Sequence, residues 1–300
     1  MSTVISKIKL YKVRTAGEVI GDTFAFVTNN FQALFKNIAS LLLPVCLIQA
    51  WAFSLYVDAC LSINSLVDSN GNFDLSQAMG LFGSMSFYIL ITIISQLILA
   101  SLMFAIIKYD EQSELGLRGV RLSALMPLFK KNMKRMLVLT GVSILLAVLL
   151  GGLSVALSLV IGLWSMLLMF VITLILIGPL VLLTPVYVIE ENISVWAAIK
   201  KALRLGMNTW GKIVGVIIVM SVICIIIQGI FTLPWCVLFL AKTLMAMDGG
   251  AEDLFVNSVS YSILSYFAAV LLSFSYVLIY MVLYVCEAYL YGHAVEKNND

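Results

Sequence analysis

The chain contains six long stretches that are rich in apolar residues and free of Lys and Arg, at about residues 38–57, 83–107, 136–158, 161–188, 213–239 and 262–287. A transmembrane helix needs about 20 predominantly apolar residues, so each stretch is long enough to cross a bilayer. Transmembrane β-strands are instead alternating segments of about ten residues. We therefore expect an all-α, polytopic membrane protein with six transmembrane helices.

Composition supports this interpretation. Of the 300 residues, 62% are hydrophobic and 11% are charged, whereas soluble globular domains carry about 25% charged residues. A soluble protein with buried helices would need more polar surface than this chain supplies. Residues 1–37 are too polar for a secretory signal peptide, and the first apolar stretch is longer than a signal-peptide core. We therefore expect that stretch to be retained as a spanning helix.

The Lys and Arg residues predict the orientation of the six spans. Seventeen of the 18 lie on one side if every stretch crosses the bilayer, and only Lys242 lies on the other. Acidic residues accompany Lys242: Asp58, Asp68, Asp74, Asp248, Glu252 and Asp253. Because short cytoplasmic loops carry the excess of Lys and Arg, we expect both termini to be cytoplasmic. The topology already explains the basic residues, so nucleic acid is not an expected partner.

We interpret residues 1–300 as a single integral membrane domain built from three related units, at about 16–110, 115–190 and 191–292. Each unit would be an amphipathic helix followed by a hairpin of two spans, which makes the hairpins pseudo-threefold repeats. Apolar residues at steps of three or four mark one face of each short helix. These stripes are Ile20, Phe24, Val27, Phe31 and Leu34; Leu122, Leu125, Phe129, Met133 and Met136; and Trp196, Ile199, Leu203, Met207 and Trp210. Thr15, Ser123 and Ser194 stand where N-caps belong.

Two roles are open for the three amphipathic helices. A helix with an apolar stripe and Lys or Arg beside it lies flat in the headgroup region of a membrane, where each well-placed cation contributes about 1 kcal/mol with anionic lipid. Alternatively, the helices pack against one another as a cytoplasmic cap. The first role makes membrane lipid a partner and predicts a set of headgroup contacts: Lys130, Lys131, Lys134, Lys200, Lys201 and Arg204.

Within the spans, three glutamines form the most notable polar set: Gln49, Gln96 and Gln228. Such residues usually hydrogen-bond across helices, and the alternative is an intramembrane polar path for a solute. No Asp, Glu, Lys or Arg lies near the middle of a predicted span, which argues against an ion-coupled transporter. Small residues at four-residue spacing predict close helix packing. They are Ser143, Ala147 and Gly151 in span three, and Gly211 and Gly215 near span five.

Span four is the most irregular of the six. Pro179 and Pro185 lie in it, with Gly178 beside the first proline. Proline kinks a helix, and broken helices line substrate sites in some transporters, although a kink can also simply fit the bundle. Glu190 and Glu191 follow the span. They form a carboxylate pair at the membrane boundary, or they favour the dipole of the next helix.

Catalytic constellations are missing from the sequence. No HExxH, GxSxG, P-loop or GxGxxG motif is present, and the one histidine, His293, lies in a C-terminal tail where we expect it to be solvated. The five cysteines have no zinc-binding spacing, although Cys60 and Cys236 both fall near the outer face, where an oxidising compartment would let them pair. We therefore expect no enzyme activity, no cofactor and no metal.

Two segments carry a resemblance to a known family. They are Gly17-Glu18-Val19-Ile20 with Phe24 and Asn30, and Pro185 through Glu190 with Trp196 through Leu203 and Trp210. They resemble motifs of a broad bacterial family of uncharacterised six-helix inner-membrane proteins, which is similar to the membrane domain attached to some glycerophosphoryl diester phosphodiesterases. The resemblance implies a location in the bacterial inner (cytoplasmic) membrane. It implies no phosphodiesterase activity, because that barrel domain with its metal site has no counterpart here.

These observations favour an uncharacterised inner-membrane protein that organises lipid or a protein partner at the cytoplasmic face. The three amphipathic helices and the missing catalytic groups carry that hypothesis. The alternative is a passive or partner-driven transporter of an amphipathic or lipid-like solute, which the glutamines and the irregular span four would serve.

Overall fold

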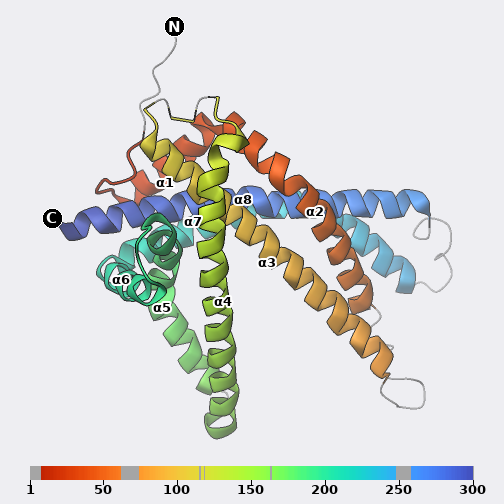
Figure 1. Ribbon diagram of the computed structural model, residues 1–300. Coiled ribbons are helices and arrows are strands. Elements are labelled where there is room, and N and C mark those ends of the chain that lie inside the picture. The colour runs from red at the N-terminus through yellow and green to blue at the C-terminus, as the bar shows by residue number, and fades with distance from the viewer. Residues whose placement is uncertain are drawn as a thin grey trace. The chain divides into compact units, whose positions relative to one another are not determined.

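The fold is described from a computed structural model that covers residues 8–61, 74–114, 116–117, 119–162, 164–247 and 258–299. Within these ranges the chain forms eight α-helices and no β-strand. The helices are α1 (Ala16–Asn29), α2 (Phe31–Leu61), α3 (Leu75–Gln112), α4 (Leu122–Ile161), α5 (Trp164–Ile189), α6 (Val195–Asn208), α7 (Trp210–Met247) and α8 (Val259–Asn299) (Figure 1). The all-α expectation is therefore confirmed for this part of the chain.

Six of the helices are long and apolar enough to cross a membrane: α2, α3, α4, α5, α7 and α8. Each corresponds to one predicted apolar stretch, and the helices extend beyond the stretches by one or more turns at most ends. The flanking sequence contains good helix formers such as Lys, Met and Gln, and the helices also continue through Gly80, Pro127 and Gly292. The chain is thus a multi-pass membrane protein in architecture.

The short helices α1 and α6 each have 14 residues and are followed after a single residue by a long helix. The short helix expected in the second unit is not separate, because residues 122–136 form the first turns of the 40-residue helix α4. Polar cap residues end the other two, Asn30 after α1 and Thr209 after α6. No comparable stop signal separates Lys134 from the apolar run that follows, so that helix continues.

The chain divides into two compact units. Unit 1 comprises residues 1–37, 100–222 and 281–300, and unit 2 comprises residues 38–99 and 223–280. Helices α2, α3, α7 and α8 contribute residues to both units, whereas α1, α4, α5 and α6 belong to unit 1. Seventeen of the 18 Lys and Arg fall in the ranges of unit 1, and Lys242 falls in unit 2.

In unit 1, α5 packs against both α4 and α6. The contact of α5 with α6 is very close at Gly206, where a Cβ atom would lie 2.5 Å from the backbone nitrogen of Pro179. Opposite it, a Cβ on Gly178 would lie 3.1 Å from the carbonyl oxygen of Gly206. Despite Pro179 and Pro185, α5 runs as one helix from Trp164 to Ile189. The Gly-Pro sequence in span four therefore serves a helix crossing.

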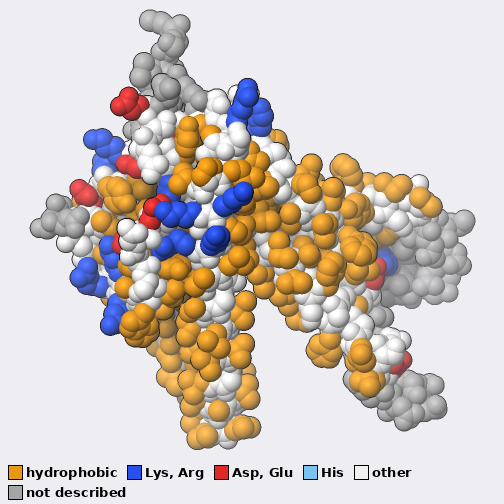
Figure 2. Space-filling view, viewed as in Figure 1, with side chains coloured by type: hydrophobic (Ala, Val, Ile, Leu, Met, Phe, Trp, Pro, Cys, Tyr) orange, Lys and Arg blue, Asp and Glu red, His pale blue; other side chains and the backbone are white. Residues whose placement is uncertain are grey.

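The remainder of the α4–α5 hairpin is covered by hydrophobic side chains that contact little of the described chain. Figure 2 shows this apolar surface on the stems of the two helices, with Lys and Arg gathered at their other end. The expectation that Ser143, Ala147 and Gly151 pack closely is wrong for this chain by itself, because all three are exposed. Gly211 and Gly215 are likewise exposed, and no described atom beyond the adjoining residues and backbone of their own helix lies within 4 Å of a Cβ at either position.

In unit 2, neutral polar groups link the helices. The Gln49 amide of α2 donates to the Thr92 hydroxyl of α3 at 3.2 Å, and the Ser275 hydroxyl of α8 donates to the Gln228 side-chain oxygen of α7 at 3.2 Å. The described residues of this unit line a cavity of about 400 Å³ among α2, α7 and α8, and a shallow, open one of about 500 Å³ between α2 and α3. Cys60 and Cys236 are not bridged.

Candidate functional site

The densest polar site in the described chain surrounds Arg135 of α4, in unit 1. Its guanidinium donates to the carbonyl oxygens of Tyr187 at 2.6 and 3.0 Å, of Glu190 at 2.9 Å and of Ile193 at 3.2 Å, and it also donates to the carbonyl of Glu191. The same group lies 4.2 Å from the ring centroid of Tyr187. The last carbonyls of a helix have no partner within it. Arg135 therefore caps the C-terminal end of α5 and orders the connection to α6.

Beside Arg135, two lysines meet the carboxylate of Glu191. Lys108 of α3, whose side chain is only 6% exposed, lies 3.3 Å from one carboxylate oxygen, and Lys131 of α4 binds the other. The buried amide of Asn132 accepts from Lys108 at 3.4 Å and donates to the Ser101 carbonyl at 3.3 Å. The hydrogen bond from Lys131, followed by that from Lys108, lowers the pKa of Glu191. The carboxylate therefore stays ionised and joins α3, α4 and the α5–α6 connection.

Glu190 makes a separate set of contacts. Its carboxylate accepts the hydroxyl hydrogen of Tyr291 from α8 at 2.6 Å and pairs with Lys201 of α6 at 2.7 Å. Tyr291 is 2% exposed. Both carboxylates of the predicted pair are thus engaged by cations and a phenol. Each acts as a structural link between helices, an arrangement that the sequence alone did not reveal.

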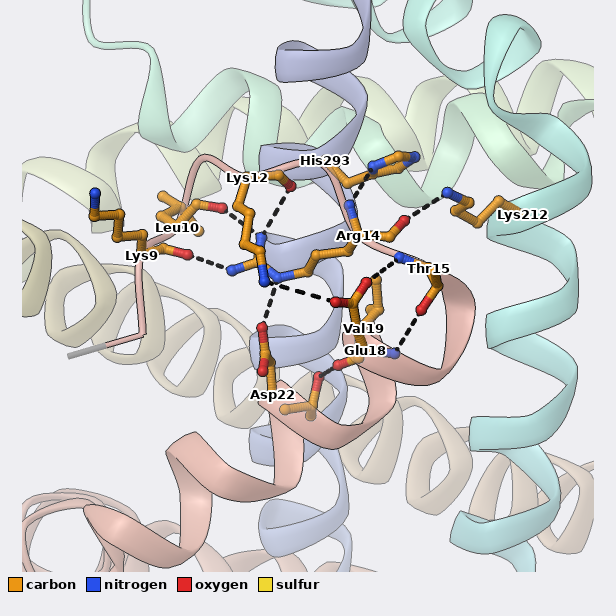
Figure 3. A network of polar contacts seen from close by, with 11 residues as sticks. Lys9, Leu10, Lys12, Arg14, Thr15, Glu18, Val19, Asp22, Lys212 and His293 are labelled. Atoms are coloured by element: carbon orange, nitrogen blue, oxygen red, sulfur yellow. Dashed lines mark hydrogen bonds and ion pairs between the residues drawn. The ribbon is translucent and has the colours of Figure 1, made fainter. Parts of the chain in front are cut away.

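A second polar site surrounds Arg14, just before α1 (Figure 3). The side chain is fully buried. It donates to the carbonyls of Leu10 at 2.8 Å, of Lys12 at 3.3 Å and of Lys9, and it pairs with Asp22 at 2.7 Å. Its guanidinium also lies 4.6 Å from the ring centroid of Tyr289. These contacts fold residues 9–14 tightly around one cation.

The segment at Arg14 is held against the end of α8. The Arg14 N–H donates to His293 Nδ1 at 3.1 Å, and Lys212 of α7 donates to the Arg14 carbonyl at 2.6 Å (Figure 3). Gly292 makes this approach possible, because a Cβ there would clash with the carbonyl of Leu10. The expectation that His293 is solvated is wrong: it is 1% exposed, and its Nε2 has no hydrogen-bond partner among the described residues.

Two of the three predicted helix caps are present in the structure. Thr15 forms a capping box with Glu18, in which the Thr15 N–H donates to Glu18 at 2.6 Å and the Glu18 N–H donates to the Thr15 hydroxyl at 3.2 Å. These bonds lower the pKa of Glu18, the Thr15 backbone contributing most. Ser194 caps α6. Ser123 does not cap α4, because that helix begins at Leu122 with Arg121 in the cap position.

The predicted headgroup set lies on the same end of unit 1, in two groups. Lys131 and Lys201 are ion-paired with Glu191 and Glu190. The remaining four are exposed and make no ion pair within the described chain: Lys130, Lys134, Lys200 and Arg204. Figure 2 shows Lys and Arg gathered over this region, above the apolar stems of α4 and α5. We call these four residues the free basic set.

The predicted polar path is not assembled by contacts among its own members. Gln49 is buried against Thr92, and Gln228 is bonded to Ser275 and Thr232. Gln96 is half-buried on α3. None of the three lines either of the two cavities of unit 2. The bonds of Gln49 to Thr92 and of Gln228 to Ser275 join neighbouring helices, which was one of the two roles that the sequence left open.

Comparison with known proteins adds no relative. No family model matches the chain, and neither a curated protein nor a solved structure is significantly similar to it.

Proposed function

We propose that the chain is a membrane-embedded module that binds and organises anionic lipid at the basic end of unit 1. The observation that carries the proposal is the free basic set, four exposed cations on α4 and α6 whose charge no described carboxylate balances. An anionic headgroup would supply that charge, at about 1 kcal/mol per well-placed cation. The proposed function has no catalytic step.

The exposed face of α6 supports lipid rather than solvent as its surroundings. Trp196, Leu203 and Met207 follow one another at helical spacing, and they are 66%, 38% and 52% exposed. Small residues make the opposite face, where Ala198, Ala202 and Gly206 are buried. Lys200 flanks the apolar stripe and lies 5.5 Å from the Trp196 ring centroid. Tryptophan beside a cation suits the boundary between headgroups and acyl chains.

The proposed orientation places this end of unit 1 in the cytoplasm. The excess of Lys and Arg supports it through the positive-inside rule. The hydrogen bond from Arg14 to His293 agrees with both termini lying on one side, whichever side that is, as an even number of spans requires. A bacterial inner membrane fits both this proposal and the family resemblance. Organisation of a protein partner at the same surface would use the same cations.

The transporter alternative has less support. It needs a polar route through the spans, whereas Gln49 and Gln228 each form a bond to a neighbouring helix within unit 2.

The test compares charge variants of the full chain in native-lipid discs. Neutralising the free basic set with K130Q, K134Q, K200Q and R204Q should lower the phosphatidylglycerol retained per chain at least fivefold, because even one such cation contributes about 1 kcal/mol. Lipid extracted from the purified discs is quantified by mass spectrometry.

Two matched variants control the experiment. K130R, K134R, K200R and R204K preserve the charge and should retain the lipid. Neutralising four other exposed cations of unit 1, Lys9, Lys12, Lys36 and Lys297, makes the same change in net charge elsewhere. An equal loss in this second control would mean that only net charge matters, and an unchanged lipid content in the test variant would refute the proposal.

A further inference from the structure

A preformed cavity of about 400 Å³ lies in unit 2, and its walls are the final turns of α2 and α7 and the first turns of α8. Its volume is within the usual range for small-molecule sites. Each helix contributes residues at helical spacing, so one face of each helix points to the same space. The lining includes Asp58 from α2, Trp235 and Lys242 from α7, and Tyr261 and Tyr266 from α8.

Three hydrogen bonds hold the walls of this cavity together. Lys242 donates to Asp58 at 2.8 Å and joins α7 to α2. The Tyr261 hydroxyl donates to the Leu238 carbonyl at 2.9 Å and joins α8 to α7, while the Tyr266 hydroxyl donates to the Leu47 carbonyl at 3.0 Å and joins α8 to α2. The three bonds therefore link α2, α7 and α8 to one another in pairs around the cavity. A ligand would find the walls in place, which lowers the cost of binding.

The charges of the cavity select for a zwitterion. Lys242 is the one Lys or Arg in unit 2, and Asp58 is its partner. An anion would gain from Lys242 but would meet the charge of Asp58, and a cation would meet the opposite difficulty. A ligand carrying both charges can pair with both residues, and complementary potentials of this kind give specificity. Both side chains keep solvent access, 34% exposed for Lys242 and 61% for Asp58, so they can exchange partners.

The remaining lining offers an aromatic ring for an ammonium group and apolar side chains for a hydrocarbon chain. The Trp235 ring lines the cavity and stacks on Phe239, with their centroids 5.0 Å apart. Aromatic faces attract ammonium groups. The hydroxyls of Ser54, Ser262 and Ser265 add hydrogen-bonding groups, while Val57, Leu238 and Phe239 are apolar. The helix ends place the cavity where a bilayer has its headgroups.

We propose that this cavity binds the headgroup of a zwitterionic phosphodiester of the phosphatidylethanolamine type, with its phosphate at Lys242 and its ammonium at Asp58 and Trp235. The proposal goes beyond the lipid surface of unit 1 and uses none of its residues. The same chemistry is present in a phospholipid and in its water-soluble headgroup. The experiment therefore distinguishes these two sources.

The test uses the full chain, purified in mild detergent and titrated with phosphatidylethanolamine, phosphatidylglycerol or phosphatidylcholine under native mass spectrometry. Wild type should retain one phosphatidylethanolamine molecule in preference to the other two lipids. K242Q and D58N should each weaken that binding about tenfold, because a hydrogen bond to a charged group contributes about that factor. Glycerophosphoethanolamine is added in competition. Displacement of the lipid at equal concentration would assign the site to the soluble headgroup, and its failure to compete would assign the site to the lipid; both results support the chemistry.

Further variants separate binding from folding. The exchange D58K with K242D keeps an ion pair but reverses the order of the charges, so it should fold and still lose the lipid. D74N removes another carboxylate of unit 2, one that accepts from the N–H groups of Ser76 and Gln77 at the start of α3, and it should bind as wild type does. Equal retention of the three lipids by wild type, or unchanged binding in both K242Q and D58N, would overturn the proposal. Neutralising the free basic set should leave this binding intact, so the proposal and the proposed function can fail separately.

Discussion

Unit 1 and unit 2 link their helices with different polar chemistry. In unit 1, the side chains of Arg14 and Lys108, which are buried, and of Arg135, which is half-buried, bind carboxylates, amides and backbone carbonyls. In unit 2, the links are amide and hydroxyl groups such as Gln49 and Gln228, and the one ion pair of its described residues, Asp58 with Lys242, lies at the helix ends. A charge inside hydrocarbon is costly, whereas a neutral hydrogen bond is tolerated. The division indicates that the charged links of unit 1 lie near an aqueous boundary, whereas the neutral links of unit 2 suit the hydrocarbon region.

The largest test of this comparison is Arg135→Met. The substitution leaves the carbonyls of Tyr187, Glu190 and Ile193 without their donor, and we expect a loss of about 3 kcal/mol in stability. Thermal unfolding in detergent, followed by fluorescence-detected size exclusion, measures it. The control is Arg121→Met, because Arg121 is exposed and makes no side-chain cap bond. Equal melting temperatures for the two variants would contradict the capping role of Arg135.

A smaller effect is expected from Gln49→Leu in unit 2. The substitution removes a 3.2 Å bond to Thr92, whose hydroxyl still donates to the Tyr88 carbonyl at 2.9 Å. Hydrogen bonds between membrane helices contribute about 0.6 kcal/mol on average, so the loss should be several times smaller than for Arg135→Met. The same thermal assay applies, with Gln32→Leu as the exposed control. A loss as large as that of Arg135→Met would remove the contrast between the units.

The smallest effect is a pH dependence from Glu191. Ion pairing lowers the pKa of this carboxyl below its ordinary value of 4.5, so its contribution to stability is complete above about pH 4.5 and disappears as the pH falls through the lowered pKa. We expect wild type to melt at a higher temperature than Glu191→Gln at pH 7, and the difference to shrink below pH 4.5. Glu114→Gln is the control at an exposed carboxylate with no ion pair in the described structure. A difference that stays constant from pH 7 to pH 3.5 would contradict the assignment.

The six long helices could be predicted from the sequence. A helix that crosses lipid needs a long run of apolar residues, and such a run is visible in the local sequence. The apolar stripes on the short helices did not predict which helix faces are buried. Trp196, Leu203 and Met207 face outward on α6, whereas Leu125 and Met136 of the second stripe are buried. Periodicity identifies a face of a helix, but the neighbours decide what covers it. In α6 the small residues Ala198, Ala202 and Gly206 allow close packing and turn the large ones outward.

The partners of the buried charges were beyond sequence reasoning for a related reason. Arg135 reads as one more basic residue after Lys134, and nothing local distinguishes the residue that caps α5 from the one exposed to the surroundings. Its acceptors are backbone carbonyls more than 50 positions later, and backbone groups carry no sequence signal. The burial of His293 differs from the expectation because α8 continues beyond the last apolar stretch to Asn299, so that His293 lies in a helix and not in a tail.

The contact between Arg14 and the end of α8 has a consequence for biosynthesis. The N–H of Arg14 is paired with a ring nitrogen of His293, 279 positions later in the chain. Ribosomes add about 5–20 residues per second, so Arg14 is synthesised roughly 15–60 seconds before His293. Throughout that time the cation of Arg14 lacks the Tyr289 ring, and Gly292 is not yet present to accept Leu10. This contact therefore forms only after α8 has been synthesised, which places it among the last steps of assembly.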